Sequence, residues 1–238
     1  MKRVLGLVFF GLVWVSTGYG QYVDKGAWYM SIVDGQAAKS YANYLKSNEI
    51  RSNRVGFVAG YLFNPMTKSN VNSPVQIGAE FGILSWGSEK VDNYFGGDFE
   101  AKYGSTWLNA VARYRPVLDA SKINPFFDIF FGPEFRNTRI IEKLDDATAT
   151  YNGQTSKVFK QNTVLKNYGI GAGVGIKYLK KNGSLRYVDI GLYYKHAEKA
   201  KMIARNSFYI DRDGQIFYDE KLVRPASFQL RVGLTGFL

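Results

Sequence analysis

The stretch that decides the fold is Tyr168-Gly-Ile-Gly-Ala-Gly-Val-Gly-Ile-Lys-Tyr178. Aliphatic or aromatic side chains occupy every second position, and glycine or lysine occupies each position between them. Successive side chains of a strand point to opposite faces, so the stretch predicts a β-strand with one apolar face and one small or polar face. A dinucleotide-binding loop is excluded, because Val174 or Ile176 stands where its last glycine would be.

The same alternation recurs in seven other blocks, at 27–32, 55–63, 75–83, 108–115, 126–136, 187–195 and 227–238. A tilted strand needs about 9–11 residues to cross a membrane, and bacterial single-chain barrels have an even number of strands. The sequence therefore predicts an all-β fold: an eight-stranded antiparallel up-and-down transmembrane β-barrel, with its apolar faces toward lipid and its mixed faces toward a filled polar lumen.

Composition narrows the classes of protein and site. The 238 residues include no cysteine, which excludes disulfides, a zinc–thiolate site, a cysteine nucleophile and a lipid anchor on cysteine. The single histidine argues against a histidine-rich metal site, and we predict neither a metal nor a cofactor. The net charge of +11 is compatible with nucleic acid, an anionic membrane surface or an acidic partner.

The first twenty residues indicate the compartment to which the chain is sent. Lys2 and Arg3 precede an uncharged apolar run, Val4 to Val15, which is too short to span a hydrocarbon core of about 30 Å. Gly18 and Gly20 then occupy positions −3 and −1 of a cleavage site. We therefore expect 1–20 to be a signal peptide cleaved before Gln21, which makes nucleic acid an improbable partner.

The connections between the blocks alternate in length. Predicted long loops fall at about 34–52, 87–105, 138–166 and 197–224, and short turns fall at about 64–74, 117–123 and 179–185. Outer-membrane barrels place long loops outside the cell and short turns in the periplasm. The order predicts a barrel domain over 21–238 with both termini in the periplasm.

Charged residues occupy the faces predicted to point inward. They are Glu80, Arg113, Arg115, Asp128, Glu134, Arg136, Lys177, Asp189, Lys195 and Arg231. An eight-stranded barrel is just wide enough for side chains to fill it, which favours a self-paired ionic network over the alternative, an ion path or proton relay. Glycines on the same faces would make room for long side chains.

These features resemble the small bacterial outer-membrane β-barrel superfamily. The resemblance rests on the signal peptide, the eight blocks and a last strand ending Gly233-Leu-Thr-Gly-Phe237-Leu238, and it covers 21–238. The superfamily includes the OmpX- and OmpA-type barrels and the "outer membrane protein beta-barrel domain" proteins of the Bacteroidota type. The resemblance implies the outer membrane of a Gram-negative bacterium. In such families the last residue is commonly aromatic, whereas here Phe237 is penultimate and Leu238 is last.

Three functions remain open. The first is a non-enzymatic surface or interaction protein, or an accessory subunit of an envelope complex, whose loops bind a partner protein or lipopolysaccharide. The basic residues Lys195, Lys199, Lys201 and Arg205 are the predicted contacts to lipopolysaccharide phosphates. The second is a narrow channel for small or apolar solutes. The third is a lipid A-modifying enzyme using His196, but no nucleophile, base and orienting group can be placed together, so we predict no catalytic residue.

Overall fold

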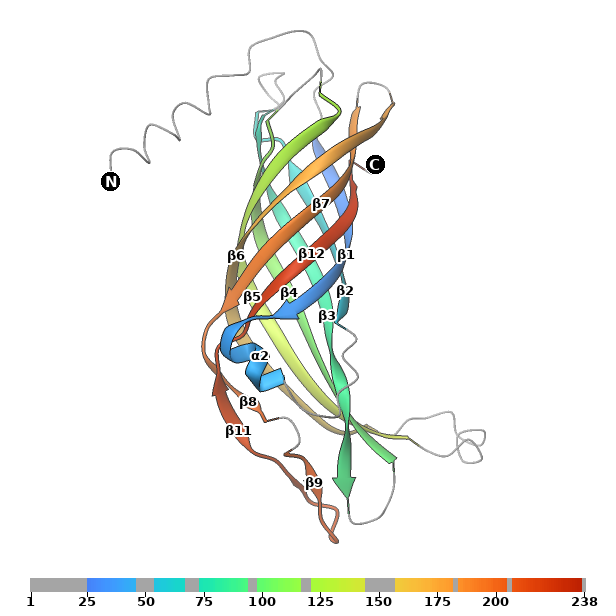
Figure 1. The fold of residues 1–238 in the computed structure, drawn as a ribbon, viewed down its shortest axis with the longest axis vertical. Coiled ribbons are helices and arrows are strands. Elements are labelled where there is room, and N and C mark those ends of the chain that lie inside the picture. The colour runs from blue at the N-terminus through green and yellow to red at the C-terminus, as the bar shows by residue number, and fades with distance from the viewer. Residues whose placement is uncertain are drawn as a thin grey trace, which may run out of the picture.

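The computed structural model describes residues 25–45, 54–66, 73–93, 98–116, 121–143, 157–181, 184–204 and 207–236. The predicted signal peptide, 1–20, and Phe237-Leu238 lie outside the described residues. Eight long strands form the wall of a barrel (Figure 1). They are β1 (Gly26–Ala37), β2 (Val55–Phe63), β3 (Val75–Asn93), β4 (Asp98–Tyr114), β5 (Ile123–Lys143), β6 (Lys157–Lys181), β7 (Ser184–Ala197) and β12 (Ala226–Thr235).

The wall closes on itself. Each strand pairs antiparallel with its neighbour in the order β3-β2-β1-β12-β7-β6-β5-β4, and pairing of β3 with β4 joins the two ends. The predicted eight-stranded up-and-down barrel is therefore confirmed. Closure pairs the backbone groups of every wall strand on both sides, which a strand in hydrocarbon requires.

The two faces of the wall differ as the alternation predicts. Outward side chains are large and apolar: Ile32, Phe131 and Leu192 are 65%, 68% and 68% exposed. Inward positions carry buried charges such as Glu80 and Arg231. A contiguous apolar exterior of this extent is unfavourable in water and favourable in lipid, so this wall is of the transmembrane type.

The two ends of the barrel are built differently. The start of β1 and the end of β12 lie at one end, which we call the turn end, together with three short connections, between Phe63 and Val75, Tyr114 and Ile123, and Lys181 and Ser184. We call the opposite end the cap end. There the chain forms α2 (Lys39–Leu45), a helix of seven residues, and no helix in the described ranges could span a membrane.

At the cap end the strands run further than the sequence blocks did. β3 continues to Asn93, β4 begins at Asp98, β5 continues to Lys143 and β6 begins at Lys157. Much of 87–105 and 138–166, predicted as loops, is therefore paired strand, and that assignment is corrected. In β3 the physical reason is a bulge between Ser85 and Gly87, which interrupts the period of two. Beyond it, charged outward side chains give the sequence the composition of a polar loop.

These strand extensions belong to a second packed unit, which we call the cap. It comprises α2, the parts of β3, β4, β5 and β6 on the cap side of residues 85, 105, 136 and 163, and four short strands, β8 (Ala200–Ile203), β9 (Tyr209–Ile210), β10 (Ile216–Phe217) and β11 (Glu220–Val223). β8 pairs with β11, and β9 pairs with β10 and runs parallel to the tip of β3. Figure 1 shows this unit below the barrel.

The cap has an apolar core that is continuous with the apolar side chains inside the barrel. Its buried members come from the strand extensions and from the segment predicted as loop 197–224; they include Trp86, Val91, Phe99, Tyr103, Ile140, Met202, Ile203, Phe208, Ile210 and Val223. Phe159, Phe208 and Tyr218 pack ring to ring, with centroids 5.4–5.9 Å apart. Along β3 to β6 the inward face thus becomes mostly apolar within the cap, where Glu89, which accepts a hydrogen bond from Tyr103, is a buried charged exception.

Candidate functional site

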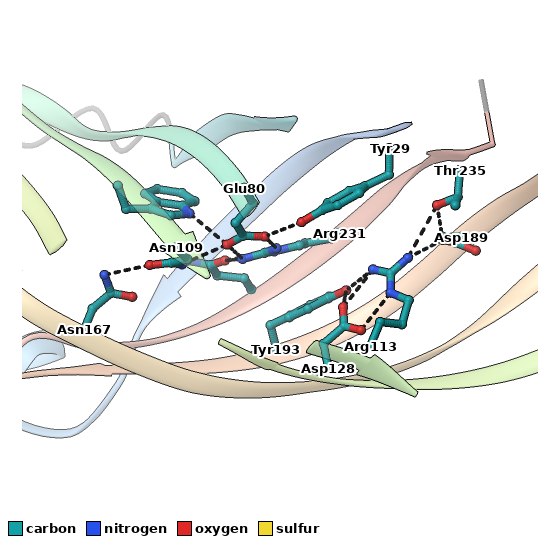
Figure 2. Close-up of polar contacts among 12 residues, drawn as sticks. Tyr29, Glu80, Asn109, Arg113, Asp128, Asn167, Asp189, Tyr193, Arg231 and Thr235 are labelled. Carbon is teal, nitrogen blue, oxygen red and sulfur yellow. Dashed lines mark hydrogen bonds and ion pairs between the residues drawn. The ribbon is translucent and has the colours of Figure 1, made fainter. Parts of the chain in front are cut away.

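The inward charges are arranged in three successive groups along the barrel axis, which we call the turn-end, middle and cap-end groups. Nine of the ten residues predicted for the lumen are buried in them, at 7% exposure or less. Figure 2 shows the turn-end and middle groups side by side inside the wall.

The turn-end group joins two arginines to two aspartates. The Arg113 guanidinium donates to both carboxylate oxygens of Asp128, each at 2.7 Å, and to Asp189 at 3.1 Å. Arg115 donates to the same Asp189 at 2.7 and 2.8 Å. The Thr235 hydroxyl also donates to Asp189, so that this one carboxylate connects β4, β7 and β12. Each charge therefore has at least one opposite charge within contact.

The middle group is centred on Glu80. Its Oε2 accepts from Arg231 at 2.8 Å and from the Tyr29 hydroxyl at 3.0 Å. Its Oε1 accepts from the Trp107 indole at 3.0 Å and from the Asn109 amide at 2.9 Å. These donors come from β1, β4 and β12, and Glu80 itself lies on β3. A single carboxylate thereby holds four strands of the wall in register.

The cap-end group lies where the lumen meets the cap. Glu134 is fully buried between Arg136, at 2.6 Å, and Lys195, at 3.0 Å. The Arg136 guanidinium also donates to the hydroxyl of Tyr41 on α2 and lies over the Trp86 ring, 5.0 Å from its centroid. This group therefore ties the barrel to the helix of the cap.

Aromatic rings occupy the space between the ionic groups. Arg113 lies 4.5 Å from the centroid of Phe126, Arg231 lies 4.0 Å from that of Tyr193, and Lys195 lies 3.8 Å from that of Trp107. Cations on the faces of aromatic rings gain further stabilisation when they are desolvated.

Inward glycines leave the room that these rings need. A Cβ built on Gly82 would overlap the indole of Trp107, and one built on Gly171 would overlap the ring of Tyr193. Rings, ion pairs and the side chains around them thus fill the interior together.

The other predicted residues lie toward the two ends of the barrel. Lys177 lies on the inward side of β6 near the turn end, where it is partly buried. Lys195 is only 3% exposed and pairs with Glu134, so its predicted contact with lipopolysaccharide is wrong; it belongs to the inward face of β7. Lys199 is exposed just before β8, Lys201 is exposed on β8, and Arg205 lies outside the described residues.

The network also has uncharged members, which were not among the predicted lumen residues. Tyr29, Asn109 and Tyr193 lie on inward faces by the same alternation that located the charges, so the signal was present. Asn167 donates to Asn109 at 3.0 Å and fits the same periodicity, one residue before Tyr168. Tyr41 follows no strand pattern, because a helix carries it into the lumen mouth.

His196 is placed in an aromatic environment. Its ring lies 5.2 Å from that of Tyr168 and 6.3 Å from that of Tyr194, centroid to centroid. The hydroxyl of Ser207, a serine of the following segment, is engaged with the backbone of Ala204 and Asp219. These contacts fit a histidine at the rim of the wall.

Comparisons with known proteins give structural likenesses without a family assignment. No family model matches the chain, and no curated protein matches it. Among solved structures, the chain is similar to Neisserial surface protein A (12% identity, 90% of this chain and 98% of that chain covered, TM-score 0.46). It is also similar to Ail, the attachment invasion locus protein of Yersinia pestis (11%, 88% and 97%, 0.39), and to a major outer membrane protein from Thermus thermophilus (11%, 88% and 98%, 0.44).

Proposed function

We propose that the chain is a non-enzymatic outer-membrane barrel of a Gram-negative bacterium that acts as a surface interaction protein, alone or as an accessory subunit of an envelope complex. Its cap faces outward and binds a partner protein or lipopolysaccharide. The observation that supports the proposal is the combination of a filled lumen with a cap whose apolar core continues that of the barrel interior. Such a molecule offers a rigid surface held outside the membrane.

The filled lumen argues against the channel alternative. The three ionic groups and the rings between them occupy the cross-section with buried side chains, and removing water from a charge is unfavourable unless its partners replace it. We expect the purified barrel to show no stepwise conductance in planar bilayers, measured beside an open porin as the positive control. Reproducible conductance steps would favour the channel instead.

The outward position of the cap can be tested with single cysteines, since the chain has none of its own. Asp213 lies in an exposed turn of the cap, and Lys122 is exposed at the turn end. We expect an impermeant maleimide to label Asp213→Cys in intact cells and Lys122→Cys only after the outer membrane is permeabilised. The reverse pattern would place the termini outside and refute the proposed orientation.

Partner binding by the cap can be tested by site-specific photo-cross-linking. Leu222 of β11 and Leu192 of β7 are matched probes, since both are leucines on strands and are 66% and 68% exposed. We expect a photoreactive residue at 222 to give a discrete adduct with a protein or with lipopolysaccharide in native membranes. A probe at 192 should give only membrane lipid. Discrete protein adducts from 192 alone would move the interaction from the cap to the barrel wall.

A further inference from the structure

The outward face of β3 to β6 changes chemistry in three successive rows as it leaves the barrel. The first row is mostly apolar: it contains Thr106 of β4 together with Ile83, Phe135 and Val164, and these three are each at least 41% exposed. The second row is small or polar: Ser85, Gly104, Asn137 and Asn162. The third row is cationic, because Lys102 of β4, Arg139 of β5 and Lys160 of β6 stand directly opposite one another.

The cationic row is unfavourable unless something compensates it. Like charges directly opposite on neighbouring strands destabilise a sheet, and strands about 4.8 Å apart bring all three cations within about 10 Å. Within the described residues, the ion pair of this row joins Lys102 to Glu100 at 3.7 Å. An exposed pair of that length contributes little. The arrangement therefore favours an external anion with several oxygen atoms.

A groove connects the cationic row to the lipid-facing wall. It has a volume of about 340 Å³ and opens where β2 begins at Val55 and β3 bulges at Ser85. Its apolar side is formed by Val55, Phe57 and Ile83, and Lys102 and Arg139 line its other side. Gly104 lies between them and contributes no side chain, which keeps the groove open.

On β4 and β5 these rows also indicate the height of the groove in a bilayer, whereas on β6 the exposed, outward Lys166 lies on the barrel side of Val164. The cations stand four residues beyond the last apolar row, about 13 Å along a strand and about 10 Å along the membrane normal for strands tilted by 35–45°. This is the level of lipid headgroups. An amphiphile lying along the wall would therefore place its acyl chain in the apolar part of the groove and its phosphate at the cations.

We infer that this groove binds one molecule of lipopolysaccharide, with the lipid A phosphates held by Lys102, Arg139 and Lys160. The inference rests on the proposed function, since an outward cap exposes the groove to the outer leaflet. It assigns the contact to residues of β4, β5 and β6, whereas the basic segment at 199–205 lies beyond β7.

The test uses the full chain refolded in detergent and measures retained lipopolysaccharide per barrel by native mass spectrometry. We expect Lys102→Gln/Arg139→Gln/Lys160→Gln to weaken binding about tenfold or more, as the loss of three charge-assisted contacts implies. The matched control, Lys199→Gln/Lys201→Gln/Lys221→Gln, removes the same charge from exposed positions near β8 and β11 and should bind like wild type. Equal loss in both variants, or loss only in the control, would overturn the assignment.

Two further arms separate the phosphate from the acyl chain. The wild type should bind dephosphorylated lipopolysaccharide weakly, with the same affinity as the triple variant has for the phosphorylated form. If the wild type bound both forms equally, the role of the phosphate would be refuted.

Gly104→Leu tests the apolar part of the groove, because the new side chain fills it. The nearest atom to a Cβ at this position, 2.9 Å away, belongs to the flexible Asn137 side chain. The substitution should weaken binding, whereas Ala110→Leu, on the same outward face of β4, should not. Unchanged binding by Gly104→Leu would exclude the groove.

Failure of the proposed function and failure of this inference are distinguishable. Binding to the purified barrel does not depend on orientation in the cell, whereas cysteine labelling at 213 and 122 does. Labelling in the reverse pattern together with normal binding would refute the outward cap alone.

Discussion

Replacing Glu80 by alanine is the sharpest perturbation of the lumen. The carboxylate accepts hydrogen bonds from Arg231, Tyr29, Trp107 and Asn109, at 2.8–3.0 Å, and is 2% exposed. Alanine would leave the Arg231 guanidinium buried with the amide of Gln229 as its remaining acceptor in the middle group, at 3.0 and 3.2 Å.

The expected loss follows from that unpaired charge. Removing one partner of a buried ion pair costs about 3–5 kcal/mol, and leaving buried donors without an acceptor adds to the cost. We therefore expect Glu80→Ala to lower the free energy of unfolding by about 4–5 kcal/mol. Glu80→Gln keeps the shape and one acceptor oxygen, so it should cost about 2–3 kcal/mol.

The measurement is urea unfolding in lipid vesicles, followed by circular dichroism and by heat-modifiable migration on SDS gels. Trp107 contacts the mutated side chain, so tryptophan fluorescence would mix local and global changes. Glu198→Ala is the matched control, because its pair with Lys166 is 3.9 Å long and exposed, and should cost less than about 1 kcal/mol. If Glu80→Ala cost no more than Glu198→Ala, water would reach the lumen, and the filled-barrel argument would fail.

Three further variants test packing and the junction with the cap. Gly82→Val should lose about 2–3 kcal/mol in the same unfolding assay, because the added methyls overlap the rigid indole of Trp107. Gly214 has a φ of 76°, and a Cβ added there meets no neighbouring atom. Gly214→Ala should therefore cost about 1–2 kcal/mol of backbone strain, confined to the cap. A change in the Tm of the barrel would contradict that confinement. Tyr41→Phe removes the hydroxyl that accepts a hydrogen bond from Arg136 and should cost about 1 kcal/mol. We expect faster proteolysis near α2, while the heat-dependent gel shift of the barrel stays unchanged. An unchanged rate of digestion would show that this hydrogen bond does not hold the cap in place.

Much of the barrel could be predicted because its wall obeys one rule. Period-two alternation located the eight strands, and it separated the lipid-facing Ile, Val, Leu and Phe residues from the inward charges. The same parity placed nine charges in the buried interior. Which charges pair was not predictable, because Glu80 and Arg231 are far apart in sequence and meet through the closure of the wall.

The cap could not be predicted, because its signals conflict with the rule for the wall. The bulge at Ser85 and Gly87 shifts the parity of β3, and the outward Lys102 and Arg139 resemble loop residues. Tyr41 enters the network from a helix that continues no strand pattern. The cationic row depends on lateral register across β4, β5 and β6, which no single segment of sequence contains.

At the second outward row the exposed side chains change from apolar to polar, and this change affects how deeply the barrel sits in the bilayer. Sliding the barrel toward the turn end by the spacing of the rows would draw Lys102, Arg139 and Lys160 into the edge of the hydrocarbon, where a cation costs about 0–1 kcal/mol, rising to about 2–4 kcal/mol at the midplane. Sliding it the other way would lift Phe135 and Val164 into water. The outward side chains therefore favour one depth in the bilayer, and a partner that binds the cap as proposed would meet it at a defined height above the membrane.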